Sequence, residues 1–382
     1  MSNPQHDECA DRLRKLKADL MNYENVTTED RECIRFLLSS KDADLRSDAI
    51  IALQRISNRF PDDVKAVSSK LLELIEDEDV IRLLNKKDMY PFSWIVGQFH
   101  DIFYDISIIP RLVALFKNKE KYLGNRGLAL DLLNTLASSY PDDIAEQGTQ
   151  SLIDLVENEN DRDLWYTALG LILKILDKLT DEHSLRRIIS RSIQLLDERY
   201  AFTSDGIPLY GIREGALDIL NALCKRYPKE VSRAVPTLVH IIDERSIEII
   251  EKIPPDKLFD QYANEIETFV SGLKPRLASH EYQDVRIAIR GLKLLSVLSE
   301  HDPTIACKTI PDLINNISPN TDYGLLLGAL DILARASRLC YAEVAKAAPK
   351  LREIVEIHHN QEIVNKARDV LNLIDANRLH KY

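Results

Sequence analysis

The sequence predicts an all-α fold, namely a right-handed α-solenoid of about eight two-helix repeats with capping helices at its ends. Three features predict this class: the scarcity of glycine, an internal repeat, and prolines at regular positions within that repeat. Only 12 of the 382 residues are Gly and 15 are Pro. Sandwiches, barrels and Rossmann sheets need many tight turns, and such turns depend on Gly. A chain so poor in Gly is therefore expected to be predominantly helical.

The internal repeat is clearest in three segments that superpose without gaps, residues 46–61, 126–141 and 213–228. Each segment starts with Arg. An Ala follows three residues after this Arg, a Leu seven residues after it, an Ile or Leu ten residues after it and an aromatic residue fourteen residues after it. These offsets place the apolar residues on one stripe of a helix, and the small Ala lets a neighbouring helix approach closely. A Pro follows the aromatic residue and is expected to end this first helix.

A second helix is expected after a short turn, and a further Pro marks it. This Pro is expected to bend the second helix or to lie in its first turn, where the missing N–H costs little. The turn sites recur about every 40 residues, with an insertion before Pro228 and two units between Pro228 and Pro303, and such a period is in the range of HEAT and armadillo arrays. The second-helix prolines are Pro110, Pro236, Pro311 and Pro349.

The pattern Asp44-x-Arg46-x-x-Ala49, with the helix-end segment Phe60-Pro61-Asp62-Asp63, resembles the HEAT repeat of the HEAT/armadillo-like family. Residues 140–143 and 284–286 resemble it as well. The resemblance covers residues 28–376 and implies one elongated domain. Residues 1–27 are then an N-terminal capping helix, and residues 377–382 are a C-terminal tail.

The Arg that opens a unit is expected to hold neighbouring units together. Arg46, Arg126 and Arg213 are each expected to pair with an acidic group on an adjacent unit. Two segments depart from the repeat pattern. Residues 87–101 lack the Arg and Ala spacing, and Pro254 and Pro255 interrupt a first helix, so irregular units are expected there.

Composition and charge argue against several classes of function. The chain has 50 Lys and Arg against 61 Asp and Glu, a net charge of −11, which argues against a dedicated nucleic-acid binder. The N-terminal residues are polar, and residues 164–176, the richest apolar stretch, are too short to span a bilayer. The cysteines are scattered without a CxxC and are expected to be unpaired core residues. We therefore expect a soluble, cytoplasmic protein. The five cysteines are Cys9, Cys33, Cys224, Cys307 and Cys340.

Catalytic constellations are scarce. No HExxH, GxSxG or P-loop motif occurs, and we expect no catalytic residue, cofactor or metal. Di-iron hydroxylases with HEAT-like repeats use several His-Glu pairs, whereas this chain has only His280-Glu281. The alternative function is nevertheless a HEAT-like lyase or metal-dependent hydroxylase. A DNA-binding HEAT-like protein fits less well, because the chain is acidic and Trp165 is expected to lie in the core.

Residues 89–104 form an aromatic segment that is a candidate binding site for a partner. They hold six of the 25 aromatic residues of the chain. Tyr and Trp are enriched in binding hot spots, which makes Tyr90, Phe92 and Trp94 candidate anchors. Alternatively, these side chains fill gaps inside an irregular second unit.

Residues 198–212 form an insertion, and insertions in solenoids map to loops on one face, often the binding face. Tyr200, Phe202 and Tyr210 make this insertion unusually apolar for a solvated loop, which is the alternative. Deletion of residues 201–209 is expected to weaken partner capture with little effect on thermal stability.

The second helices of such solenoids line the concave surface, where extended partners lie. Their expected exposed positions make the middle of this groove mildly basic, which would attract an acidic peptide, although a solvated charged face is the alternative. We therefore expect a non-enzymatic scaffold or adaptor that binds another protein or an extended acidic peptide. The candidate positions are Arg186, Arg187, Arg191, Arg233, Thr237, His240, Lys308 and Asp312.

Overall fold

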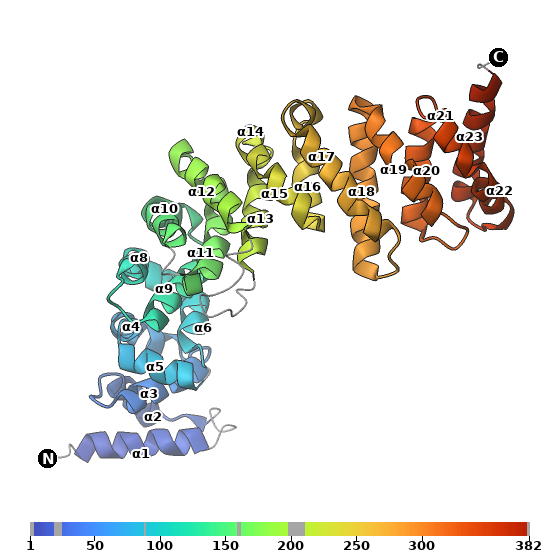
Figure 1. The fold of residues 1–382 in the computed structure, drawn as a ribbon. Coiled ribbons are helices and arrows are strands. Elements are labelled where there is room, and N and C mark those ends of the chain that lie inside the picture. The colour runs from blue at the N-terminus through green and yellow to red at the C-terminus, as the bar shows by residue number, and fades with distance from the viewer. Residues whose placement is uncertain (1–3, 19–24, 88, 159–161, 198–210, 380–382) are drawn as a thin grey trace. The chain divides into compact units, whose positions relative to one another are not determined.

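The computed structural model describes residues 4–18, 25–87, 89–158, 162–197 and 211–379, and every regular element in these ranges is a helix (Figure 1). The predicted all-α solenoid is confirmed. The chain divides into two compact units, an N-terminal unit of residues 1–191 and 199–215 and a C-terminal unit of residues 192–198 and 216–382. The boundaries of a single domain over residues 28–376 stay a prediction.

In the N-terminal unit, first and second helices alternate along the chain. The first helices are α3, α9 and α11, and α5 with α6 replaces a single first helix; α4, α8, α10 and α12 are second helices. The bounds are α1 Pro4–Ala18, α2 Thr28–Leu37, α3 Ala43–Ile56, α4 Pro61–Ile75, α5 Glu78–Lys86, α6 Pro91–Gln98, α7 His100–Asp105, α8 Ile108–Lys117, α9 Leu123–Leu136, α10 Pro141–Glu157, α11 Arg162–Ile175, η3 Leu176–Lys178 and α12 Glu182–Leu195.

The C-terminal unit continues the alternation, with the first helices α13, α16, α18 and α20 followed by α23 (Figure 1). The division between the units passes through α12 and α13. The bounds are α13 Ile212–Leu223, α14 Pro228–Val231, η5 Ser232–Ala234, α15 Val235–Ile241, α16 Glu244–Lys252, α17 Pro255–Leu277, α18 Tyr282–His301, α19 Pro303–Asn316, α20 Tyr323–Ala336, α21 Tyr341–Val344, η6 Ala345–Ala347, α22 Ala348–Ile357 and α23 Gln361–Leu379.

The helix-end prolines of the three superposable segments open the second helix of their repeats. Pro61, Pro141 and Pro228 are the first residues of α4, α10 and α14, a position where a missing N–H leaves no hydrogen bond unmade. The preceding first helix α3 already ends at Ile56, so a four-residue turn lies between the two helices. The proline therefore fixes where the second helix starts.

The further proline lies in the first turn of a helix in two repeats, which is one of the two expected places. Pro236 and Pro349 lie in the first turns of α15 and α22, each preceded by a 3₁₀ turn that breaks the second helix. Pro311 lies inside α19, which continues through it.

The two irregular segments differ in kind. Residues 87–101 are irregular as expected, because α6 and the start of α7 lie there and α5 with α6 takes the place of one regular first helix. Pro254 and Pro255 were expected to interrupt a first helix, and this is wrong. They lie in the turn between α16 and α17, where two consecutive prolines end one helix and start the next. The kink of this repeat lies instead at Tyr262 inside α17, with φ −134° and ψ 31°.

The predicted apolar stripe forms the core of each repeat. Ala49 and Leu53 of α3, Ala129 and Leu133 of α9, and the equivalent residues of α13 are all completely buried. Removing such a leucine from water stabilises the fold by roughly 1.5–3 kcal/mol.

The cysteines overturn part of the sequence analysis. Cys9 of α1 is disulfide-bonded to Cys33 of α2, and Cys307 of α19 is bonded to Cys340, the residue before α21. Only Cys224 is a free, buried thiol. Residues 24 and 33 positions apart meet because neighbouring helices stack, which their spacing in the sequence does not reveal. The cysteine pattern thus gives no support to a reducing compartment, and the cytoplasmic location stays a prediction.

Candidate protein-binding surface

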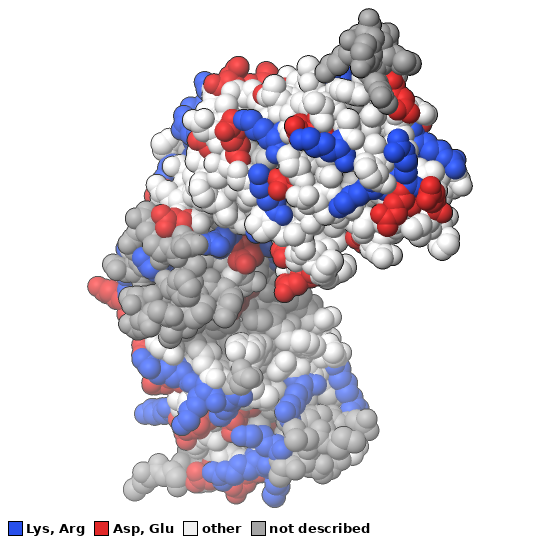
Figure 2. Space-filling model, turned by 45° about the vertical axis from the view of Figure 1, so that its right-hand side comes forward, with Lys and Arg blue, Asp and Glu red and all other residues white. Residues whose placement is uncertain are grey.

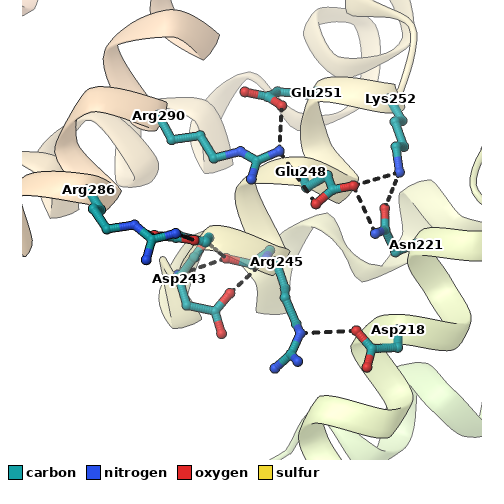
Figure 3. Close-up of polar contacts among 11 residues, drawn as sticks. Asp218, Asn221, Asp243, Arg245, Glu248, Glu251, Lys252, Arg286 and Arg290 are labelled. Carbon is teal, nitrogen blue, oxygen red and sulfur yellow. Dashed lines mark hydrogen bonds and ion pairs between the residues drawn. The ribbon is translucent and has the colours of Figure 1, made fainter. Parts of the chain in front are cut away.

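A series of cross-helix ion pairs joins consecutive first helices of the C-terminal unit; we call it the first-helix ladder. Figure 2 shows that Lys and Arg side chains are interspersed with Asp and Glu on this unit, and Figure 3 shows the centre of the ladder. The pairs, with nitrogen–oxygen distances, are Asp218–Arg245 at 3.0 Å, Glu244–Arg286 at 2.7 Å, Glu248–Arg290 and Glu251–Arg290 at 3.4 Å, Glu300–Arg335 at 2.6 Å, and Asp331–Lys366.

The spacing of charges along the helices explains the ladder. Glu244 and Glu248 are one turn apart on α16, and Arg286 and Arg290 are one turn apart on α18. When the two helices pack side by side, acid faces base at both levels. The opposite sides of the helices carry buried apolar residues such as Ile250, so the charges remain on the outside.

Glu248 is the most connected member of the ladder (Figure 3). It accepts a hydrogen bond from Asn221 Nδ2 at 3.0 Å and one from Lys252 Nζ at 2.9 Å, and it pairs with Arg290. The hydrogen bonds from Asn221 and Lys252 lower the pKa of Glu248. The carboxylate therefore stays charged and links α13, α16 and α18.

A groove of about 390 Å³ lies between the N-terminal turns of α16 and α18; we call it the α16/α18 groove. Residues 243–245 line one side, and Tyr282, Gln283, Arg286 and Ile287 line the other. The Tyr282 side chain is 73% exposed, the highest value among the large hydrophobic residues described. The Arg286 guanidinium carbon lies 5.7 Å from the centre of the Tyr282 ring. An aromatic face and guanidinium groups are thus presented together to solvent.

This groove was not predicted, although the sequence contains a signal for it. The acids of α16 and the arginines of α18 recur at intervals of three or four residues, the spacing of one helix face. Arg286 was considered only as part of the repeat pattern.

The candidate binding residues on the second helices of the N-terminal unit all lie on α12, and neighbouring groups already bind most of their guanidinium groups. Arg187 binds Glu157 at 2.6 Å and Asp154 at 3.0 Å, and these carboxylates raise its pKa. Arg186 is exposed beside Glu182. Arg191 was predicted to be exposed, and this is wrong, because its residue is only 6% exposed. Its Nε donates to the Val156 carbonyl at 2.7 Å, and its guanidinium lies over the buried Trp165 ring.

The candidate binding residues on the second helices of the C-terminal unit lie on η5, α15 and α19. Arg233 and His240 are exposed and Thr237 is half-buried, with His240 Nδ1 2.7 Å from the Pro236 carbonyl. Lys308 pairs with Glu267 at 2.5 Å, and Asp312 pairs with Lys274 at 3.0 Å. The structure therefore gathers ion pairs on α19 where the sequence suggested a basic stripe.

The aromatic segment is mostly structural. Phe92 was a candidate anchor, and this is wrong, because it is 1% exposed in the core beneath α6. Trp94 is half-buried, with its ring edge against Phe99 at 6.5 Å, whereas Tyr90 is exposed. Tyr104 stacks on Tyr140 of the next repeat at 4.1 Å. Phe92 thus fills the core of an irregular unit, as the alternative interpretation held, and the role of exposed Tyr90 as an anchor stays a prediction.

The candidates of the insertion, Tyr200, Phe202 and Tyr210, lie outside the described residues. The first described residue after them is Gly211, which has φ 87°. A Cβ atom at this position would lie 2.3 Å from the Tyr166 ring, so only glycine fits where the chain returns to α13.

Two of the repeated arginines hold neighbouring elements together. Arg46 binds Asp77 of the next unit at 2.8 Å, as predicted. Arg126 is buried, and its Nε donates to the Phe116 carbonyl at 2.8 Å, near the end of α8. This hydrogen bond goes to a carbonyl that the helix end leaves unpaired, and the acidic partner of Arg126 stays a prediction.

The described residues contain no cluster of three or more His, Cys, Asp or Glu side chains arranged to hold a metal ion. None of the described helices combines the length and apolar character needed to cross a membrane.

Comparison with known proteins shows the fold. No protein-family model and no curated protein sequence matches the chain. Over 99% of its length the chain is similar to a chain in a structure of Kap95p with RanGDP, with a TM-score of 0.59 and 13% identity, and to one in a Kap95–Nup1 complex, with a TM-score of 0.51 and 13% identity. It spans about half, 52%, of the length of either chain. The protein thus has a HEAT/armadillo-like helical-repeat fold.

Proposed function

We propose that the protein is a non-enzymatic scaffold that binds another protein through the outward faces of its stacked helices. The observation that carries the proposal is the α16/α18 groove, where exposed Tyr282 lies beside Arg245 and Arg286. Tyr and Arg are the residue types most enriched in binding hot spots, together with Trp.

The fold supports the same proposal. Stacked repeats offer a long surface on which many modest contacts add up, and each repeat interacts only with its neighbours. The two similar chains come from structures of Kap95p with RanGDP and of Kap95 with Nup1, which supports a protein or peptide as the partner. On this proposal, Arg233 and His240 of the second helices form an additional contact area for an acidic segment.

Site-specific photo-cross-linking tests the scaffold function. A photoreactive phenylalanine analogue is placed at Gln283 in the groove or at Thr237 on α15, with Glu120 in an exposed loop of the N-terminal unit as the control. After irradiation in cells of the natural host, the same protein partner should be joined to the chain from Gln283 or Thr237 and not from Glu120. No adduct at either test position, or equal adducts at all three, would refute the scaffold.

A further inference from the structure

We infer that the α16/α18 groove binds a single Asp or Glu side chain of an extended partner segment, together with an aromatic or apolar residue next to it. The inference rests on the proposed scaffold function and names the chemistry of its partner. Unused hydrogen-bond donors, an open aromatic ring and a balanced local charge support it.

Arg245 and Arg286 each have guanidinium N–H groups that their ion pairs within the protein do not use. Arg245 faces Asp218 through Nε at 3.0 Å, and its two terminal nitrogens point away from that carboxylate (Figure 3). Arg286 binds Glu244 side-on, through Nε at 2.7 Å and Nη2 at 2.8 Å, which leaves Nη1. Among the described residues these remaining nitrogens have no acceptor. A guanidinium group only donates, and a carboxylate is the acceptor that matches its geometry best.

The groove also has a place for the neighbouring side chain of the segment. The Tyr282 ring is largely exposed, and Ile287 lies five residues further along α18 on the groove wall. A ring or a branched apolar side chain packed there would be desolvated next to the charge-assisted hydrogen bonds. About 390 Å³ is enough for two such side chains but is small for a complete pocket.

The charge balance selects one carboxylate over a polyanion. Asp243 and Glu244 line the same groove as Arg245 and Arg286, so the formal charges of the lining cancel, and Asp218 beside Arg245 adds one negative charge. Asp243 Oδ1 is bound by the Ser246 backbone N–H at 2.7 Å, and both Glu244 oxygens are bound by Arg286. A nucleic-acid backbone or a run of acids would place several negative charges beside these two carboxylates, which repel them. Recognition is therefore directional, with a weak dependence on salt.

A pair of labelled peptides tests the inference on the full-length protein. The probe is acetyl-Gly-Phe-Glu-Leu-Gly-amide with a fluorophore, and its counterpart has Gln in place of Glu. In fluorescence anisotropy the Glu peptide is expected to bind about tenfold more tightly, the effect of one charge-assisted hydrogen bond. Its Kd should rise by about threefold or less between about 50 and 200 mM salt, because only one charge is involved.

Variants with matched controls locate the site. Arg245→Gln and Tyr282→Ala should each weaken the Glu peptide by about tenfold, and Arg245→Gln should remove the preference over Gln. The controls are Arg335→Gln, which breaks the Glu300 pair on the same face, and Tyr323→Ala, which changes the first residue of α20 as Tyr282 is the first of α18. Both controls should bind the peptide like the unmodified protein. Circular dichroism melts confirm that all four variants are folded.

Three results would overturn the inference: no binding of the Glu peptide at about 1 mM, equal binding of the Glu and Gln peptides, or tighter and strongly salt-dependent binding of poly-glutamate. These outcomes can be told apart from failure of the scaffold function. If cross-linking finds a partner at Thr237 and not at Gln283, the scaffold stands and the groove assignment falls.

Discussion

Arg126 and Trp165 perform the same task in successive repeats with unlike side chains. The Nε of Arg126 donates to the Phe116 carbonyl at 2.8 Å, and the indole N–H of Trp165 donates to the Leu155 carbonyl at 3.1 Å. Each donor lies 10 residues after its acceptor, and each acceptor lies in the last turn of a second helix. The carbonyls there have no partner within the helix, so a donor from the next first helix stabilises the junction.

Replacing these donors should cost stability. Arg126→Ala is expected to lower the free energy of unfolding by about 2 kcal/mol, because a buried carbonyl loses a charged donor. Trp165→Phe keeps most of the ring and should cost about 1 kcal/mol. Arg14→Ala on the exposed side of α1 is the control and should change stability by less than about 0.5 kcal/mol. Urea unfolding measures all three, and an Arg126→Ala protein of normal stability but weakened partner binding would contradict this role.

Tyr140 offers a test by titration. Burial and the hydrogen bond that its hydroxyl donates to Asp101 at 2.5 Å raise the pKa of Tyr140 to about 12. An unfolded tyrosine has a pKa of about 10, so the stabilisation from this bond is complete below pH 10 and is lost between about pH 10 and 12. Ultraviolet titration of phenolate formation should show Tyr140 among the late-titrating tyrosines, together with Tyr104 and Tyr323, whose carboxylate partners also raise their pKa values. Asp101→Asn should lower the pKa of Tyr140 only in part, because burial is the larger cause, whereas Asp143→Asn, which removes the acceptor of Tyr104, should leave the pKa of Tyr140 raised.

At the scale of the elements, two disulfides fasten helices near the two ends of the chain. One joins α1 to α2, and the other joins α19 to the start of α21. The paired cysteines are 24 and 33 residues apart in the sequence. In the chain-entropy model, closing loops of this length adds about 3 kcal/mol each to the free energy of unfolding. Cys224 takes part in neither disulfide, and burial raises the pKa of its thiol to about 11.

Counting the reactive thiols distinguishes this arrangement from five free cysteines. With iodoacetamide at pH 8, the native protein should take up no label, because Cys224 is buried and protonated. In denaturant without reductant one label is expected by mass spectrometry, and five after reduction. Five labels in denaturant alone would show that the disulfides do not form. Hydrogen exchange of Cys33→Ser should show loss of protection in α1 and α2 and not in α19 or α21.

At the scale of the whole molecule, stability should be distributed over neighbouring repeats. Leu53 in α3 and Leu333 in α20 are both fully buried, one in each unit. Replacement of either by Ala should cost about 3 kcal/mol in its own repeat. Because each repeat contacts only its neighbours, hydrogen exchange should speed up in the mutated repeat and those beside it, and not in the other unit. A uniform loss of protection over both units would mean that the chain unfolds as a single cooperative block.

The sequence reveals what depends on one helix and conceals what depends on two. The stripe through Ala49 and Leu53 is periodic, so the repeat and its core follow from it. Whether Arg191 faces solvent depends on how far α12 is rotated against Trp165, which no periodicity fixes. The α16/α18 groove depends in the same way on the packing of two helices, and so does each disulfide.

Arg290 of α18 pairs with two carboxylates of α16 at once. Its Nη2 is 3.4 Å from Glu248 and 3.4 Å from Glu251, which lie almost one turn apart on α16. If α18 slides along α16, one ion pair lengthens as the other shortens, and the sum of the two attractions changes little. The Arg290 pairs therefore resist separation of the two helices but oppose sliding only weakly, whereas the two-point Glu244–Arg286 pair between the same helices opposes both movements. Arg290 thus keeps α16 and α18 joined over a small range of offsets, and the Glu244–Arg286 pair limits the offset that a partner lying across both helices can impose.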